Sequence, residues 1–327
     1  MKTKFPVISV FLFVWLLVML LFMGCGSAQK SDHTEGEELQ GTISVSGAFA
    51  LYPLTVRWAE EFRKVHPKVR IDISAGGAGK GMADVLSGMV DLAMFSREIT
   101  PPEIGKGAWW IAVTRDAVLG TYNASNPYAE EIRKYGISKA TLKSIYLDQA
   151  IKHWNQIPGI KGEEHPIIVY TRSDACGAAE IWGQFLGKNQ ESLCGIGVFG
   201  DPGIADAVKS DKFGMGFNNV IYVYDINSRK KYEGLEIIPI DFNNNGLIDP
   251  HENFYETLDE ISAAIADQRY PSPPARDLYF ISKGKPEKHL VKVFLKWILE
   301  DGQQFVAEAG YVKFSDDKIK EQLEKLK

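Results

Sequence analysis

The chain has 327 residues, 45% of them hydrophobic and 24% charged, so it can bury a large core and has room for two lobes. Its formal net charge is −5 and it carries no basic block, which argues against a nucleic-acid partner. The six histidines are scattered, and neither a Ser/His/Asp pattern nor a metal-hydrolase spacing occurs, so we do not expect an enzyme.

The N-terminus predicts an exported lipoprotein. Lys2 and Lys4 precede an apolar run over residues 7–23, and Gly24 and Cys25 follow it. This order is typical of a bacterial lipoprotein signal, in which residues 1–24 are removed and Cys25 carries the lipid. An uncleaved membrane anchor is the alternative. Both predictions place the protein outside the cytoplasm, on the periplasmic side of a bacterial membrane or at the cell surface. Residues 25–40 are polar without an apolar period, which predicts a flexible tether.

A first strand–turn–helix–strand unit follows. Residues 69–73 alternate with the period of a half-buried strand, residues 74–81 form a turn of small residues, and apolar residues then recur at helical spacing. A second apolar strand over residues 90–95 ends at Ser96 and Arg97. The right-handed crossover makes the two strands parallel, and the free N–H groups at the helix start form a potential anion site. The alternative is a glycine turn that only connects strand to helix.

A second unit of the same kind lies further along the chain. Residues 167–170 predict a strand that leads into a small-residue turn with Arg172 and Cys176, and residues 180–186 predict a helix. Two such units on separate lobes would face one another across a cleft. The other expected elements are strands over 42–45, 109–113, 215–224, 235–240 and 278–281, helices over 54–65, 254–265 and 289–299, and mainly helix and loop over 116–162.

Residues 241–252, DFNNNGLIDPHE, match the calcium loop of an EF-hand. Oxygen-bearing side chains occupy positions 1, 3, 5, 9 and 12, glycine occupies position 6, and an apolar residue occupies position 8. The expected Ca²⁺ ligands are Asp241, Asn243, Asn245, the carbonyl of Leu247, Asp249 and Glu252. A strand precedes the loop and a helix follows it, so a structural ion is expected rather than a sensor, which needs a helix pair. An Asn-rich turn without metal is the alternative.

Two cysteines remain once Cys25 is assigned to the lipid. Cys176 and Cys194 lie in a chain expected in an oxidising compartment, which favours a disulfide between them. The alternative is two buried free thiols.

Several segments in one order carry a family resemblance: SGAFALYPL, GKGMADVLSGMVDLAMFSREIT, ISKATLKSIY, TRSDACGAAEIW, FGMGFNNVIY and DLYFISKGKP followed by DGQQFVAEAGYVKF. From about residue 41 to residue 314 the chain resembles the phosphate-binding proteins of bacterial phosphate-specific ABC transporters. The resemblance implies an α/β, two-lobed type II periplasmic-binding-protein fold. Each lobe would be a mostly parallel sheet flanked by helices, and two strands near residues 110–114 and 277–281 would join them as a hinge. The expected lobes are residues 41–112 with 276–327, and residues 113–275.

The resemblance also implies inorganic phosphate or a similar oxyanion as ligand, ABC permease subunits as partners, and a monomer. The expected ligand-site residues are Leu51, Ala78, Gly79, Ser96, Arg97, Arg172, Cys176, Gly177 and Ala178. Arg172 and Gly177 keep the family's residue types. Leu51, Ala78, Cys176 and Ala178 stand where the family has hydroxyls, and Ser96 stands where it has the aspartate that accepts the proton of phosphate.

The first interpretation is therefore a receptor that holds an oxyanion with Arg172 and backbone N–H groups, and two alternative functions remain. One is a receptor for a less polar solute, because apolar side chains replace most ligand hydroxyls. The other is a surface sensing or interaction protein that no longer serves transport.

Overall fold

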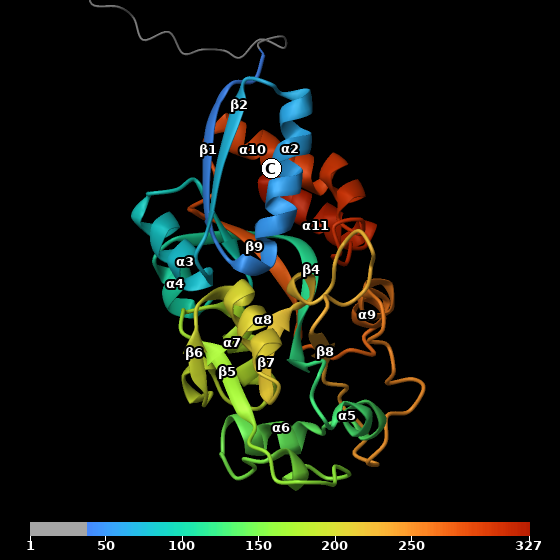
Figure 1. The fold of residues 1–327 in the computed structure, drawn as a ribbon. Helices are drawn as coiled ribbons and strands as arrows, with labels where there is room; N and C mark the ends of the chain where they lie inside the picture. The colour runs from blue at the N-terminus through green and yellow to red at the C-terminus, as the bar shows by residue number, and fades with distance from the viewer. Residues whose placement is uncertain (1–37) are drawn as a thin grey trace, which may run out of the picture. The chain divides into compact units, whose positions relative to one another are not determined.

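A long antiparallel strand pair runs through the middle of the fold, which a computed structural model describes for residues 38–327. Strand β4 (Ala108–Asn123) pairs with β9 (Ala275–Lys283) along its first part and with β7 (Gly214–Asn219) and β8 (Leu235–Ile237) along its last part. In Figure 1 this pair lies between an upper group of elements around β1 and a lower group around β5. The predicted signal peptide, Cys25 and most of the predicted tether lie outside the described residues.

The upper group is built on three parallel strands beside β9. Strand β1 pairs with β2 on one side and with β3 on the other, and β3 then pairs antiparallel with β9. The strands are β1 (Gly41–Gly47), β2 (Val69–Ala75) and β3 (Leu92–Phe95), and the helices are α2 (Tyr52–Val65), α3 (Ala78–Ser87), α4 (Pro101–Gly105), α10 (His289–Leu299) and α11 (Asp316–Leu326). Trp58, Phe62, Phe280 and Phe294 are fully buried among them.

The lower group continues the same sheet beyond β4. Strand β7 pairs parallel with β5, and β5 with the edge strand β6, so the full order is β2-β1-β3-β9-β4-β7-β5-β6 with β8 on β4. The elements are β5 (Ile168–Arg172), β6 (Ile196–Val198), α5 (Ala129–Tyr135), α6 (Lys139–Tyr146), α7 (Gly177–Phe185), α8 (Gly200–Ser210) and α9 (Leu258–Ala266). Tyr146, Trp154, Trp182 and Phe217 fill its interior.

The hydrophobic core is divided at β4 and β9. One large cluster takes its residues from 43–113 and 278–311 with Ile221, and the other takes them from 117–275. A short polar stretch of each strand, residues 114–116 of β4 and 276–277 of β9, therefore connects two separately packed cores. Among residues 38–327 no helix is long and apolar enough to cross a bilayer.

The α/β class is confirmed, and three details of the sequence prediction are wrong. Residues 116–123 were expected in helix and loop but belong to β4, where they are buried on both faces. The sheet is mixed rather than mostly parallel, because β9, β7 and β8 all run antiparallel to their neighbours on β3 or β4. The helix expected over 254–265 begins at Leu258, because Thr257 and Glu260 form a capping box there.

Candidate functional site: a buried charge network between two turns

The two predicted strand–turn–helix units touch each other directly. The amide of Gly79, in the first turn of α3, donates to the carbonyl of Ala175, 3.0 Å away, in the turn before α7. Gly177, at the start of α7, lies so close to Ser96 that a Cβ there would overlap the serine hydroxyl and carbonyl oxygens. Only glycine permits this approach of the two backbones. The structure thus brings the ends of β3 and β5 and the starts of α3 and α7 to one place.

Arg172, at the end of β5, is held between two carboxylates. Its Nε and Nη2 donate to the two oxygens of Asp174 at 2.8 and 2.7 Å, and its Nη1 donates to Asp201 at 2.5 Å. The Arg172 and Asp201 side chains are each only 1% exposed. Burial alone would lower the pKa of this guanidinium, but Asp201 and Asp174 raise it above its ordinary value. Phe49 of the other half covers the guanidinium, with 5.4 Å between Cζ and the ring centroid.

The network continues to the central strands through residues that the sequence prediction missed. Asn219, at the end of β7, donates to Asp201 at 2.8 Å and accepts a hydrogen bond from Arg276 Nη2 on β9. Arg276 faces Asp116 of β4 in the strand register, 3.7 Å apart, and its Nε donates to the carbonyl of Ser96 at 3.1 Å. One buried chain of polar contacts therefore links β5, α8, β7, β9, β4 and β3. No local pattern of the sequence singles out Asp116 or Arg276, because each stands next to another charged residue of its strand, Arg115 or Asp277.

Burial shifts the acidity of two groups in this network. It raises the pKa of Asp116 to about 6, although Arg276 and the backbone N–H groups of Ala117 and Val220 oppose the shift. It also raises the pKa of the Cys176 thiol to about 12, against the lowering effect of Arg172, so this thiol stays protonated at neutral pH.

The expected disulfide is wrong for this structure, in which Cys176 and Cys194 are both free. The Cys176 sulfur accepts the amide of Ala179 at 3.4 Å and so caps α7. The Cys194 sulfur lies 3.7 Å from the carbonyl of Leu147. Each thiol is thus held at a separate local position, one at a helix start and one beside α6.

Several other expected ligand residues do not present polar groups to the site. Leu51, Ala78 and Ala178 are buried in the hydrophobic clusters, with 0–2% exposure. Arg97 makes a bidentate pair with Glu103 at 2.7 and 3.0 Å, and it lines one pocket with Gly79, Ala175 and Cys176. The expected residues that the structure does bring together are Gly79, Ser96, Arg97, Arg172, Cys176 and Gly177.

The predicted calcium loop folds around its own carboxylates. The oxygens of Asp241 accept the amides of Asn245 and Gly246 at 3.2 and 2.9 Å, and Glu252 accepts those of Phe242, Asn243 and Asp249. Asp249 accepts the side-chain amides of Asn243 and Asn245 at 2.8 and 2.9 Å. Gly246 has φ +80°, which suits the glycine of position 6. The oxygen-bearing side chains thus converge on one region, as a hard cation requires.

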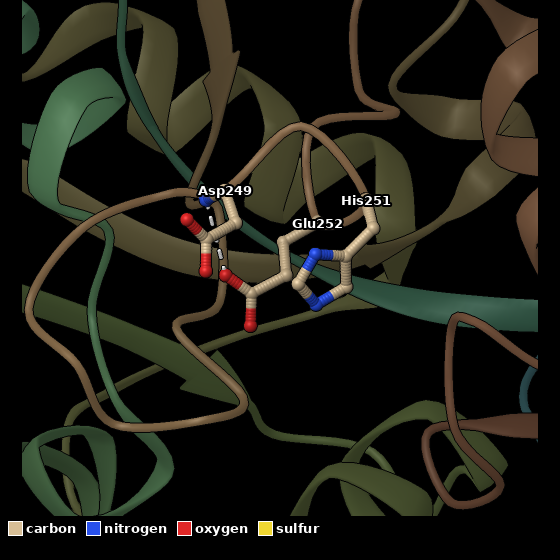
Figure 2. Close-up of side chains that lie close together, drawn as sticks. All are labelled: Asp249, His251 and Glu252. Carbon is tan, nitrogen blue, oxygen red and sulfur yellow. Dashed lines mark hydrogen bonds between the residues drawn. The ribbon is translucent and has the colours of Figure 1, made fainter.

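Two observations bear on the predicted calcium loop at residues 241–252. Residues 253–257 separate it from α9, so the predicted helix directly after the loop is absent and the prediction was wrong on this point. His251 also lies beside the carboxylates, and ligand atoms of Asp249, His251 and Glu252 all lie within 4.8 Å of one another (Figure 2). Imidazole is a ligand for transition metals rather than for calcium, so the choice of metal depends on whether His251 takes part.

Comparison with known proteins assigns the class of the chain. The model of the PBP superfamily domain matches residues 32–301, which is most of the chain, and the protein belongs to this superfamily.

Its relatives within that class are phosphate-binding proteins. The phosphate-binding protein PstS of Methanocaldococcus jannaschii is 24% identical, with 91% of this chain and 88% of that protein covered. PstS of Bacillus subtilis is 31% identical over 56% of this chain and 62% of that protein. Among solved structures, a putative phosphate ABC transporter substrate-binding protein from Clostridium perfringens with bound phosphate has a TM-score of 0.69 at 22% identity, covering 84% of this chain and 100% of the other. A receptor for phosphate transport from Vibrio cholerae has a TM-score of 0.60 at 19% identity, with 83% and 100% covered, and both structures share this fold.

Proposed function

We propose that this protein is the extracytoplasmic solute-binding lipoprotein of an ABC importer and takes phosphate or a related oxyanion between its two lobes. Lobe 1 comprises residues 41–112 and 276–327, and lobe 2 comprises residues 113–275. The two core clusters separate near the same residues, which supports this division. Binding rather than catalysis is the activity, ABC permease subunits are the partners, and the protein acts as a membrane-anchored monomer.

The observation that carries this proposal is the position of Arg172. The guanidinium binds Asp174, whose carboxylate lies beside Gly77 at the start of α3 and whose turn leads into α7. Backbone N–H groups at the starts of two helices from opposite lobes favour an anion. Bending of β4 and β9 near residues 110–114 and 277–281 would separate the lobes and admit the solute.

A second function is favoured by the direct contact between the two turns. The lobes are joined through their own backbones, by the Gly79–Ala175 hydrogen bond and the close approach of Ser96 and Gly177. The guanidinium of Arg172 already donates hydrogen bonds to two carboxylates, those of Asp174 and Asp201. Such an arrangement suits a surface sensing or interaction protein that remains closed, or a receptor for a less polar solute. The two functions differ in whether the protein binds an oxyanion at all.

Calorimetric titration of the purified, phosphate-stripped protein separates them. We expect phosphate to bind with a dissociation constant on the order of micromolar. The Arg172→Lys variant keeps the charge but loses the planar fork, so its affinity should fall at least about tenfold. Sulfate is titrated in parallel. Binding of sulfate alone would indicate another oxyanion, and no heat with either anion would contradict the phosphate proposal and favour the second function.

We also propose that residues 241–252 hold one structural calcium ion. The support is the ligand pattern of the sequence together with two carboxylates, Asp241 and Glu252, that are 4% and 1% exposed at either end of the loop. Asp241, Asn243, Asn245, Asp249 and Glu252 would supply side-chain oxygens, and Leu247 its carbonyl. The ion would supply the positive charge that these buried carboxylates lack and would cross-link the loop.

Calcium should raise the midpoint of thermal unfolding by several degrees, because a ligand of the folded state stabilises it. Glu252→Gln removes a bidentate carboxylate and should abolish this increase. His251→Ala is the matched control from the same loop and should leave the calcium response intact. Loss of the response in His251→Ala, or a response to Zn²⁺ but not Ca²⁺, would instead assign the site to a transition metal.

A further inference from the structure

Phe49 is anchored in lobe 1 by its neighbours but does not pack in the core of that lobe. It begins the short helix η1 (Phe49–Leu51), whose other two residues are 1% and 0% exposed in the core cluster of lobe 1. The hydroxyl of Tyr311, also in lobe 1, donates to the carbonyl of Ala50 at 2.8 Å and holds the backbone there. The ring of Phe49 is only half-buried and belongs to none of the core clusters formed within residues 38–327. Packing of its own lobe therefore does not explain this side chain.

The ring packs instead against lobe 2. Its centroid lies 5.4 Å from Cζ of Arg172 and 5.8 Å from the ring centroid of Phe199, which it meets edge to face with 81° between the planes. Gly200, at the start of α8, comes so close that a Cβ there would lie 3.0 Å from the ring. The hydroxyl of Tyr222 donates to the carbonyl of Phe49 at 3.1 Å. Phe49 is thus held by lobe 2 through both its ring and its backbone.

The ring also covers the guanidinium that the proposed solute would need. A guanidinium has five N–H donors, and within residues 38–327 Asp174 and Asp201 accept three of those of Arg172, so two remain for a solute. The Arg172 side chain is only 1% exposed, whereas the Phe49 ring above it is half-buried. The ring is therefore a layer between the guanidinium and solvent. Its face carries a partial negative charge, which attracts the guanidinium and repels an anion.

We propose that Phe49 is the gate of the oxyanion site. This inference rests on the proposed solute-binding function. In the closed protein the ring covers Arg172, and when the lobes separate at β4 and β9 the ring leaves lobe 2 together with η1. A solute reaches the guanidinium only in that open state.

The gate has an energetic consequence for the solute. The contacts of the ring stabilise the closed protein before any solute arrives, so only a fraction of the molecules is open. The apparent affinity for the solute is reduced by that fraction. Removing the ring should therefore increase the affinity, which loss of a side chain with a purely structural role would not do.

The chain offers a matched pair of an aromatic ring and an arginine that does not cross between the lobes. Phe305 lies over Arg57, with 5.2 Å between Cζ and the ring centroid, and Phe305 is half-buried as Phe49 is. Both residues belong to lobe 1, in η5 (Asp301–Phe305) and α2. Phe305→Ala therefore removes the same kind of contact without releasing lobe 2. Phe199→Ala weakens the gate from the side of lobe 2, at a side chain that is 61% exposed and so matters little for folding.

Hydrogen exchange of single amides, followed by NMR without any anion, measures the opening in the wild type and in Phe49→Ala, Phe199→Ala and Phe305→Ala. The Gly79 amide donates to the Ala175 carbonyl across the lobes and exchanges when they separate. We expect it to exchange about 10- to 100-fold faster in Phe49→Ala, the effect of losing a desolvated cation–π contact. The increase should be smaller in Phe199→Ala and absent in Phe305→Ala. The Ile238 amide, bonded to the Gly120 carbonyl within lobe 2 at 2.9 Å, verifies that each variant is folded.

Calorimetric titration with inorganic phosphate measures the effect on binding in the same proteins. Phe49→Ala should bind phosphate more tightly than the wild type by about the factor by which its Gly79 amide exchanges faster. Phe305→Ala should match the wild type.

Each failure has its own meaning. Unchanged exchange of the Gly79 amide in Phe49→Ala would overturn the gate, whether or not the wild type binds phosphate. Faster exchange with equal or lower phosphate affinity would overturn it too, and a wild type that binds phosphate would still have the proposed function. If Phe49→Ala binds phosphate and the wild type does not, the gate is supported and the proposed function of the wild type fails. If neither binds phosphate, both fail.

Discussion

Replacing Arg172 by alanine should lower the free energy of unfolding by about 3–5 kcal/mol, the cost of removing one partner from a buried ion pair. The substitution leaves the carboxylates of Asp174 and Asp201 inside the protein without their cation, and Asp201 is 0% exposed. Chemical denaturation followed by circular dichroism measures the loss.

The first half of the chain contains a matched surface pair. Arg70 and Asp72 have the same spacing in the sequence as Arg172 and Asp174. Their charged groups lie 2.6 Å apart, but the two side chains are 74% and 47% exposed. Arg70→Ala should cost far less than Arg172→Ala, because exposed pairs are well solvated. In a second comparison, adding Asp201→Asn to Arg172→Ala should recover part of the loss by removing one unpaired buried charge. A loss as small as that of Arg70→Ala would show that water reaches the Arg172 site.

The second large effect is a dependence of stability on pH that comes from Asp116. Burial raises the pKa of this carboxyl in the folded protein from its ordinary value of 3.8 to about 6. The folded state thus binds the proton more tightly than the unfolded state does, so this group favours folding most below pH 4. Its contribution declines as the pH rises from about 4 to about 6 and is constant above that range, and the total decline is roughly 3 kcal/mol.

Asp116→Asn isolates this contribution, because asparagine has nearly the same shape and does not titrate. Other carboxyl groups act equally in the wild type and the variant. The unfolding free energy of the variant minus that of the wild type should therefore become more positive between pH 4 and pH 6. Urea titrations at a series of pH values in this range measure the difference. Parallel curves for the two proteins would contradict a raised pKa at Asp116.

Much of the secondary structure could be predicted because its signals are local. Helix α10 has the bounds expected from its apolar spacing, His289–Leu299, and β2 extends by two residues beyond its alternating pattern. Helix α8 was not predicted, since Gly200, Pro202 and Gly203 resemble a turn, and the helix is stabilised by packing of Ile204 and Val208 in a small separate cluster. The second half of β4 was missed because a fully buried strand has no alternation to detect.

Some residues of the candidate site could be identified from the sequence, and others could not. Arg172, the small-residue turns and the loop at residues 241–252 could be identified from residue types at fixed short spacings. Asp116, Asp201, Asn219 and Arg276 could not, because none belongs to a motif and they come from four different elements. The number of cysteines and the expected oxidising compartment also predicted a disulfide that the fold does not form.

The amino-acid sequence was thus sufficient for the α/β class, the two facing units and the principal arginine, all of which depend on local patterns. Tertiary structure decided what surrounds that arginine. Asp116 and Arg276 are 160 positions apart and meet only because β4 and β9 pair antiparallel in one register. A shift of β9 by one residue against β4 would turn Arg276 to the other face of the sheet, away from Asp116, and no local pattern encodes the register.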